Sequence, residues 1–563
     1  MSDLIASETA HPEGESFFAS NPPAASWPVD TPGGRVHAEW CDDAPVTREG
    51  SLIFFFQFLE AGGRWDELIK LIPLSYSSNN ASEPKDVIGT ILLSVLNGHW
   101  RYAHINGLRG DGVNPGLLGM SHVVSEDVVR RALKKMDEST ALAWLEKQNR
   151  EAITPILFLP WILDIDNTVK PLYGHQEGAE IGYNPQKRGR PSHNYHSYFV
   201  ANLRLCLGVE VLPGKQHSAK PGMPGLWRIL EAMPREHWPT MVRGDCAYGV
   251  ETILLQCEER GVPYLFKLKH TLNVKRLVQT CLRQSHWEEA GEGWQCLESV
   301  LLLKGWSRSR RVILVRESPA VAPVGDQKRR RQNHLEPPLA EGEGWDAKPC
   351  PWSGRIAVLV TSEERHGGFS NVASIKHYRE RADAEPERSG DSQPLFSKNC
   401  WHNIIDEVKN QWGWCGFTTR KIGPSRIMAS FIALIYNGWH LYCRFYDETH
   451  NREAICADLR DHPATLSPLR SGSTRPALMQ GVGRRVESGG QKRIKVSILH
   501  QKADVITAAI TAISKEISRL ATAAEQWTIE QRWLLLLVRI YRHYFGGKRP
   551  AGFLPTGELL LSG

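Results

Sequence analysis

The sequence lacks paired cysteines. Its eleven cysteines occur one at a time, without a Cys-x-x-Cys pair and without a Cys/His cluster at the spacing of zinc ligands. This absence argues against a structural zinc site and against a scaffold held together by disulfides. It favours a protein that works in a reducing cytosol.

Long apolar runs are also missing. The start of the chain has no basic stretch followed by an apolar one, so we expect no secretory signal. The longest apolar segments, 52–59 and 533–538, are far shorter than the roughly 20 residues that a membrane-spanning helix needs. We therefore expect no membrane partner.

The chain has little net charge of either sign, because 68 basic and 62 acidic residues leave a formal charge of +6. The basic residues are clustered locally, and such patches predict a polyanionic partner. A chain of 563 residues is too long for one ordinary core, so two to four domains are expected.

The first 150 residues divide into two parts. Residues 1–34 are rich in Ser, Ala, Pro and Glu without periodicity, which predicts a disordered lead. Residues 35–150 show helical patterns, among them a basic helix at 126–136 behind a Ser125 N-cap. We expect a helical DNA-binding domain of the helix-turn-helix kind here. The alternative is a plain helical cap with a solvated basic face.

An α/β pattern begins near Ile156. In 151–272, apolar runs that end on carboxylates alternate with helical patterns, which predicts the first part of an α/β core with a mixed sheet. Residues 273–374 are β-rich, with a polar, basic loop that we expect to be disordered. The strands predicted in that region cover 299–303, 311–316 and 355–361.

Helical patterns return after this region. Residues 375–450 contain a helix that is interrupted at 386–402, followed by a long helix at 425–445. Residues 451–563 are expected to form a C-terminal linker and helices. The linker, rich in Pro, Ser, Gly and Arg, covers 462–491, and the helices cover 496–522 and 530–544.

Acidic residues end two of the predicted core strands. Asp166 ends the strand in ILDIDNT, Asp245 ends the strand in MVRGDCAYG, and Glu385 lies on a later helix. Carboxylates without nearby His or Cys ligands suit hard divalent cations such as Mg²⁺ or Mn²⁺. Two such ions can activate a nucleophile and stabilise the leaving oxygen in phosphoryl transfer. Acids at strand ends are also common as caps and salt-bridge partners, so the pattern alone leaves both interpretations open.

Three longer motifs resemble a known family. DIDNTVKPLYGHQEGAEIGYNPQKRGRPSH, RGDCAYG with the following YLFKLK, and YRERADAE with NIIDEVKNQWGWCGFTT are similar to the DDE transposases of the IS4 superfamily, IS1380 group. The resemblance covers about residues 36–446. It implies an α/β fold with an RNase H-like catalytic core, a β-rich insertion before the last acid, and helical N-terminal and C-terminal regions.

The resemblance also assigns residues to the site. In the signatures D-x-T, R-x-D and Y-x2-R-x3-E, it implies that the catalytic, metal-binding acids are Asp166, Asp245 and Glu385. It further implies that phosphates at the transposon end are contacted by Tyr378, Arg381 and Lys409.

The last motif departs from the family pattern, in which the Glu and the Lys lie seven residues apart on one helix face. Here Lys409 follows Glu385 by 24 residues. Removing the seventeen residues 386–402, which begin with a helix-breaking proline, restores the spacing of seven. If this insert loops out, the site is complete; if it does not, Lys409 leaves the site. Glu407 is the less favoured replacement for Glu385, because on an uninterrupted helix it faces about 140° away.

Several basic and aromatic side chains are further candidates for DNA contacts. Lys187, Arg188 and Arg190 lie in a Pro/Gly-flanked loop and form either a phosphate clamp or a solvated loop. Trp412 and its neighbour Trp414 either stack on a flipped base or pack in the core.

Asp164 competes with Asp166 for the first metal position, because the two lie on one face of the strand. The D-x-T match favours Asp166 and leaves Asp164 as its supporting partner. The histidines at 175, 193 and 196 could position phosphates, but histidines in an α/β core are more often structural.

Together these features predict a DNA transposase. It is expected to bind the terminal inverted repeats of its own element, to cut there with two Mg²⁺ (or Mn²⁺) ions, and to join the freed 3′-hydroxyls to target DNA. Because two ends must be held together, we expect a homodimer in a synaptic complex on double-stranded DNA, in the bacterial cytoplasm and at the nucleoid. One alternative is a transposase-derived DNA-binding protein disabled by the insert, and a weaker one is an RNase H-like nuclease.

Overall fold

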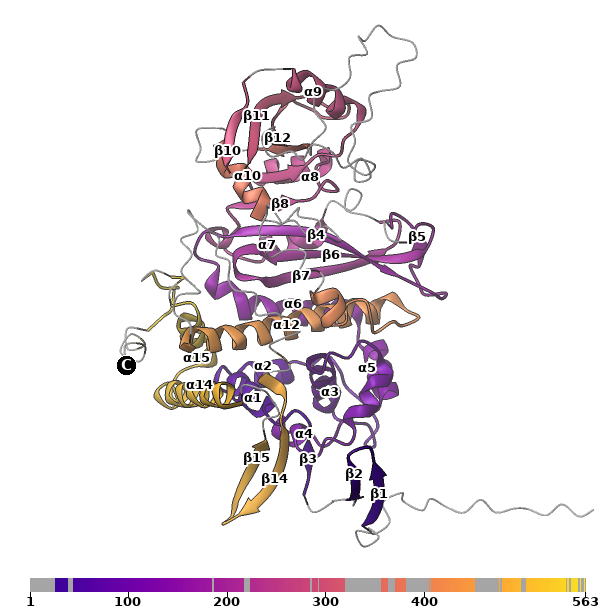
Figure 1. Ribbon diagram of the computed structural model, residues 1–563, viewed down its shortest axis with the longest axis vertical. Helices are drawn as coiled ribbons and strands as arrows, with labels where there is room; N and C mark the ends of the chain where they lie inside the picture. Colours follow the sequence, from indigo (N-terminus) through magenta and orange to yellow (C-terminus); the bar gives the residue numbers. More distant parts are fainter. Residues whose placement is uncertain are drawn as a thin grey trace, which may run out of the picture.

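The computed structural model is elongated, with a large sheet at one end, a group of N-terminal helices at the other, and the long helix α12 (Ile422–His450) between them (Figure 1). The structure describes residues 26–38, 44–184, 187–216, 223–283, 286–291, 293–318, 356–362, 370–380, 405, 407–450, 475, 478–497, 503–542, 544–545, 548–554, 557 and 561. Residues 1–25 of the predicted disordered lead lie outside the described residues. The prediction is wrong for the end of the lead, where β1 (Trp27–Thr31) pairs with the antiparallel strand β2 (Gly34–Ala38).

Within the described residues, ten strands form one sheet in the order β10-β11-β12-β13-β9-β8-β4-β6-β5, and β7 also pairs with β6. The edge strand β5 is short (Glu180–Ile181). β4 is antiparallel to β6 and parallel to β8, and β8 is parallel to β9. The five core strands are β4 (Ile162–Pro171), β6 (Pro191–Val200), β7 (Leu205–Pro213), β8 (Met241–Gly244) and β9 (Tyr264–Lys267). The fold is thus a mixed α/β fold, as the alternation of patterns predicts.

The β-rich region extends this sheet. β13 pairs with β9, so the antiparallel strands β10 to β13 continue the sheet beyond its parallel pair. Their bounds are β10 (Glu288–Gly291), β11 (Trp294–Leu301), β12 (Arg310–Glu317) and β13 (Ile356–Thr361). They include the three predicted strands, but the start of this region is helical, as α9 (Leu272–Leu282). The basic loop expected to be disordered lies outside the described residues.

Helices cover both faces of the sheet. The remaining helices of this half are α7 (Pro224–Glu231), α8 (Glu251–Glu259) and α10 (Asn371–Glu380). On one face, Gly208 of β7 leaves room for Ile229 of α7, since an added Cβ would lie 2.5 Å from the Ile229 Cδ1. On the other, the ring of Tyr436 in α12 meets Phe199 of β6 edge-on, with centroids 6.4 Å apart. Both faces of the core strands are therefore buried.

The helices predicted in the N-terminal region are present. They are α1 (Leu52–Ala61), α2 (Arg64–Lys70), α3 (Pro84–Leu96), α4 (Asn114–Leu117), α5 (Glu126–Lys135) and α6 (Glu138–Ile153). Ser125 caps α5 as predicted, because its hydroxyl accepts a hydrogen bond from the amide of Val128 at 3.4 Å. These helices pack against α12 and against the C-terminal helices α14 (Ala503–Ala523) and α15 (Ile529–Ile540).

The C-terminal prediction is wrong in one respect. Part of the expected linker and the expected start of the helix at 496 form a β-hairpin, β14 (Val482–Ser488) and β15 (Gln491–Ser497). β14 also pairs with the short strand β3 (Val46–Thr47). The alternation of charged and β-branched residues in QKRIKVS has the period of a strand, and Gly489 and Gly490 supply the turn, both with positive φ.

Asn437 joins three layers at the centre of the molecule. Its amide nitrogen donates to the carbonyl of Cys206 in β7 and to the side-chain oxygen of Asn149 in α6, both at 2.7 Å. Its amide oxygen accepts from the Cys206 amide at 2.8 Å. All three residues are buried, so each bond replaces one that water makes in the unfolded chain.

Replacing Asn437 with Ala should lower the free energy of unfolding by about 2–4 kcal/mol, because buried polar groups at Cys206 and Asn149 lose their partner. Thermal unfolding should show a lower melting temperature than for the matched variant Asn106→Ala, whose side chain is exposed. Equal melting temperatures for the two variants would contradict this account of the core.

Candidate active site

Two of the predicted catalytic acids lie next to each other in the sheet. The parallel strands β4 and β8 pair from Ile162 with Met241 up to Ile165 with Gly244. Asp166 and Asp245 follow that last pair by one residue each, so their backbones lie side by side, at a strand spacing of about 4.8 Å. Both side chains are half-buried. Two carboxylates this close repel each other, and a bound cation relieves that repulsion.

Local hydrogen bonds hold both carboxylates. The Asp245 side chain accepts from the amide of Ala247 at 2.8 Å, which fixes it at the turn that follows β8. The Asp166 side chain accepts from the amide of Asn167 at 2.7 Å. Gly244 permits this close packing, since an added Cβ would lie 2.8 Å from Ile165 and 3.1 Å from Phe266.

Asp164 forms a buried ion pair with Arg243 on the same face of the two strands. The Arg243 Nε and Nη2 atoms donate to the two Asp164 carboxylate oxygens at 2.5 and 2.9 Å. Both side chains are at most 3% exposed. Asp164 is therefore the salt-bridge partner of Arg243, two residues before Asp166 on β4. Its supporting role at a metal site stays a prediction.

Arg243 also binds helix α10, the helix that leads towards Glu385. Its Nη1 atom donates to the carbonyl oxygen of His377. Ile375 and Tyr378 of the same helix pack in an apolar cluster over the sheet, together with Met241 of β8. One guanidinium thus connects the strand of the first acid, the strand of the second acid and the helix of the third motif. The sequence showed this arginine only as a letter of the R-x-D signature.

A lysine extends the row of acids. β8 and β9 pair from Val242 with Tyr264 to Gly244 with Phe266, so Lys267 follows at the level of Asp245. The row Asp166, Asp245, Lys267 therefore crosses three adjacent strands, and Lys267 is half-buried. The sequence reasoning missed this residue. The sequence does contain a signal for it. The predicted strand in VPYLFKLKH ends on a basic residue, and the strand predicted before it ends on Asp245.

The segment after the insert covers the same face of the sheet. Lys170 lies four residues after Asp166 on β4, and its ammonium donates to the carbonyl of Gly416. Burial lowers the pKa of Lys170 to about 8. The ring of Trp414 packs on Tyr195 and Phe199 of β6, with centroids 5.9 and 6.4 Å away. Residues 407–417 are thereby attached to the core strands.

Glu407 belongs to a buried charge cluster. It is 1% exposed, and its carboxylate lies 3.4 Å from the Arg204 guanidinium and 3.3 Å from His440 Nε2. Burial lowers the pKa of His440, and hydrogen bonding to Glu407 opposes that shift. These partners supply Glu407 with a structural role, and Glu385 stays the favoured prediction for the third acid.

Trp412 has a different role from the predicted DNA contact. Its side chain is 0% exposed, and its indole nitrogen donates to Glu407 at 3.4 Å. The Arg475 guanidinium lies 4.5 Å from the ring centroid. No base can stack on a ring in this position, so the core-packing alternative applies to Trp412, and also to Trp414, which is 1% exposed.

The other residues implied by the resemblance are only partly visible. Glu385, Arg381 and the insert 386–402 lie outside the described residues. Lys409 is half-buried in a π-helical turn (Glu407–Gln411). Tyr378 is 4% exposed, so its ring packs α10 onto the sheet. The phosphate contacts of these side chains remain predictions.

The predicted phosphate clamp lies on an exposed loop before β6. Lys187 donates to the hydroxyl of Tyr173, and the Arg190 guanidinium lies 4.9 Å from the centroid of the same ring. Arg188 is exposed as well. Tyr173 thus contacts both Lys187 and Arg190. These contacts are compatible with a phosphate clamp and also with a solvated loop.

The histidines at 193 and 196 are structural. His193 Nε2 lies 2.8 Å from the carbonyl oxygen of Glu177, and burial lowers its pKa. His196 is buried against the Gln216 carbonyl and Tyr248. His175 is exposed.

The donor set decides which metal fits. Asp166 and Asp245 offer only oxygen ligands, which suit Mg²⁺ or Mn²⁺ and not a structural zinc. In the part of the chain that the structure describes, no three His, Cys, Asp or Glu residues are grouped closely enough to hold a metal ion. Of the three predicted ligands, Asp166 and Asp245 lie in that part of the chain and Glu385 lies outside it.

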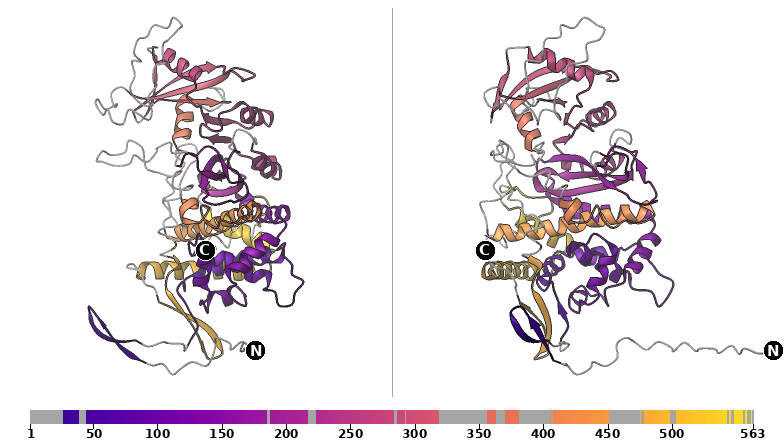
Figure 2. Two further views of the ribbon diagram at one scale, coloured as in Figure 1. Left: turned by 90° about the vertical axis from the view of Figure 1, so that its right-hand side faces the viewer. Right: turned by 45° about the vertical axis from the view of Figure 1, so that its right-hand side comes forward.

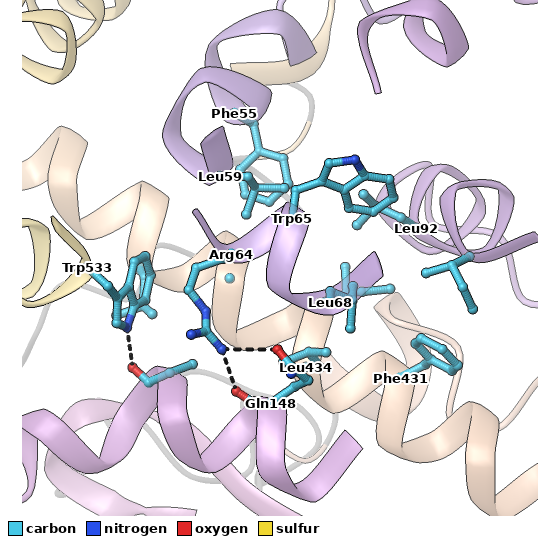
Figure 3. A pocket seen from close by; sticks show the side chains of 15 residues that line it. Phe55, Leu59, Arg64, Trp65, Leu68, Leu92, Gln148, Phe431, Leu434 and Trp533 are labelled. Carbon is cyan, nitrogen blue, oxygen red and sulfur yellow. Dashed lines mark hydrogen bonds between the residues drawn. The ribbon is translucent and has the colours of Figure 1, made fainter. Parts of the chain in front are cut away.

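A separate apolar pocket of about 70 Å³ lies among α1, α2, α3, α6, α12 and α15, far from these acids (Figure 3). Arg64 at its wall donates to the Gln148 carbonyl at 3.0 Å. Trp533 closes another side and donates to the Ala152 carbonyl at 3.0 Å. No carboxylate, thiol or histidine lines the pocket, so it offers no catalytic chemistry.

One comparison with known proteins covers the segment that carries the two acids. Residues 78–322, less than half of the chain, match the family model described as "Transposase DDE domain group 1". This segment contains Asp166 and Asp245, and the match supports a DDE transposase. It names no finer group, so the IS4 and IS1380 resemblance remains a prediction. No curated protein matches the chain.

Among solved structures, the chain is similar to one titled "Cryo-EM structure of piggyBac transposase synaptic complex with hairpin DNA (SNHP)". The sequence identity is 10% and the TM-score is 0.32, and the match covers 78% of this chain and 84% of that chain. No helix of the described residues has the length and apolar character needed to cross a membrane.

The contacts of Arg243 predict a specific effect on α10. In Arg243→Lys the ammonium can stay beside Asp164. It lacks the planar fork of the guanidinium, so it cannot also donate to the carbonyl of His377. Losing a charge-assisted bond worth about 1.5–3 kcal/mol should speed hydrogen exchange of the α10 amides by roughly 10–100-fold.

The matched control is Arg310→Lys. Arg310 is another buried arginine, 2% exposed at its side chain, and it pairs with Glu251 and Glu258 of α8. Exchange in α10 should be unchanged in that variant. Equal acceleration of α10 exchange in both variants would show that Arg243 does not anchor the helix specifically.

Proposed function

We propose that the chain is a DNA transposase of the DDE type, related to the IS1380 group of the IS4 superfamily. It binds the terminal inverted repeats of an insertion sequence, cuts the DNA there and joins the ends to a target. The observation that carries the proposal is the pair Asp166 and Asp245, side by side on parallel strands, with Arg243 binding the helix that leads to Glu385.

The proposed core is RNase H-like. Three antiparallel strands, β7, β6 and β4, are followed in the sheet by β8 and β9, which are parallel to β4. This arrangement supports the proposal because it places Asp166 beside Asp245. Asp245 directly follows β8 as predicted, whereas Asp166 lies inside β4, which continues to Pro171, and not at the strand end that the sequence predicts. Residues 35–150 are the proposed DNA-binding domain, with α5 and its basic residues as the element that reads DNA.

In the proposed site, Asp166, Asp245 and Glu385 hold two Mg²⁺ (or Mn²⁺) ions. When bound, such ions lower the pKa of a water or a 3′-hydroxyl and neutralise charge on the phosphate. Arg243 fixes the three acid-bearing elements relative to one another before DNA binds. Lys267, at the end of the row, is placed to neutralise a phosphate oxygen. Lys409, Arg381 and Tyr378 are proposed to position the backbone of the transposon end.

The position of the insert favours an active enzyme over the disabled alternative. On its N-terminal side, α10 is attached to the sheet through His377 and the apolar cluster of Ile375 and Tyr378. On its C-terminal side, residues 407–417 are attached through Lys170 and Trp414. Both attachments are to the face of the strands that carries Asp166, so each flank of the insert has its own contacts with the sheet.

The chemistry can be tested with a donor plasmid that carries the gene and its native flanking DNA. Cleavage at the element ends by Asp245→Asn should fall by at least about 10²–10³-fold, the cost of losing one stabiliser of transition-state charge. DNA binding should persist. Asp66→Asn, an exposed acid on α2, is the control and should cut normally. Normal cleavage by Asp245→Asn would exclude the proposed site.

A second variant tests the insert. Deleting residues 386–402 should leave Mg²⁺-dependent cleavage within about tenfold of the full chain, because each flank has its own contacts with the sheet and long loops are tolerated at small cost. Cleavage only after the deletion would favour the disabled DNA-binding protein. Absence of cleavage with and without the insert would contradict the transposase proposal itself.

A further inference from the structure

The hairpin β14–β15 is a projecting element without an assigned role. It is attached to the body at its base, where Gly483 and Arg484 pair with Thr47 and Val46 of β3. The glycine at 483 is required there, because an added Cβ would lie 2.8 Å from the Cα atom of Gly50. From this base the two strands extend away from the helices and end in the Gly489–Gly490 turn (Figures 1 and 2).

The hairpin is strongly basic. Residues 481–497 contain five Arg or Lys residues and one acid, Glu487. The acid lies directly opposite Lys492 in the register of the two strands, so it offsets a charge on that face only.

The opposite face has no acid. Residues paired across an antiparallel ladder point to the same side, and the pairs Arg484 with Lys495 and Val486 with Arg493 share this side. The side chains of Arg493 and Lys495 are exposed. We call the side with Arg484, Arg493 and Lys495 the basic face of the hairpin.

The shape of the hairpin suits a duplex. A strand of seven residues is about 23 Å long, and a two-stranded ribbon is narrow enough for the DNA major groove, which is about 12 Å wide. Basic side chains at every second position face successive phosphates along one side of such a ribbon. The like charges on the basic face do not stabilise the hairpin itself, which has little apolar surface to bury.

We propose that the basic face of the β14–β15 hairpin is a binding site for the sugar-phosphate backbone of duplex DNA. The hairpin lies at the end of the molecule opposite to β8–β12, beyond the N-terminal helices (Figure 1). It therefore contacts DNA away from the phosphate that is cut, and it contributes to binding and not to the chemical step. That the duplex is the end of a transposable element rests on the proposed function; the binding of duplex DNA does not.

The test measures affinity for a fluorescent duplex of arbitrary sequence as a function of salt concentration, with the full chain in an Asp245→Asn background that cannot cut. The double variant Arg493→Gln/Lys495→Gln removes two charges from the basic face. The slope of log K against log salt should become shallower by about 1.8, since each lost phosphate contact removes about 0.9.

The matched control is Arg485→Gln/Lys492→Gln. It removes one Arg and one Lys from the same hairpin, but from the opposite face. Its slope should equal that of the unaltered hairpin. Equal slopes for all three proteins, or an equal loss in both double variants, would overturn the assignment of the basic face. Unchanged circular dichroism and melting temperature show that each variant is folded.

The two experiments distinguish failure of the hairpin proposal from failure of the transposase proposal. If the chain does not cut DNA but the basic-face variant still shows the shallower slope, the transposase proposal fails and the hairpin site stands. In the second case, the chain with Asp245 intact cuts saturating DNA at the same rate with the unaltered hairpin and with the basic-face variant, and the two salt slopes are equal. The hairpin proposal then fails and the transposase proposal stands.

Discussion

The candidate site depends on the three-way contact of Arg243. Its guanidinium binds both oxygens of Asp164 and the carbonyl of His377, in a place where it is almost completely buried. A buried charge of this kind is costly unless every partner is in place. The strands β4 and β8 and the helix α10 therefore come together as one unit. Asp166 follows Asp164 by two residues and Asp245 follows Arg243 by two residues, so both acids are positioned by the same ion pair.

This contact also explains how the site can coexist with an insertion in its last motif. The insert interrupts the chain between α10 and the turn at Glu407–Gln411, and each flank has contacts of its own with the sheet. Arg243 and an apolar cluster hold one flank, while Lys170 and Trp414 hold the other. The candidate site on the sheet and the basic hairpin thus lie on opposite sides of α12 (Figure 1).

Local patterns in the sequence predicted local structure well. The N-cap of α5 and the strand at 311–316 depend on neighbouring residues, so they were predicted from the sequence alone. The acids at 166 and 245 were predicted as strand ends, but their side-by-side placement depends on the register of β4 with β8, which no local pattern contains. The same holds for Lys267. Trp412 was ambiguous because stacking and core packing require the same side chain, and only tertiary contacts distinguish them. The hairpin was missed because its glycine and arginine content is also that of a linker.

The central claim is that Asp166, Asp245 and Glu385 surround one divalent-metal site. Backbone cleavage by Fe²⁺ bound in place of Mg²⁺ tests it most directly, because the radicals formed at the ion cut the chain only next to it. The account predicts fragments that end near residues 166, 245 and 385, all suppressed by excess Mg²⁺. Cleavage near 166 and 245 without cleavage near 385, or cleavage elsewhere in the chain, would contradict it.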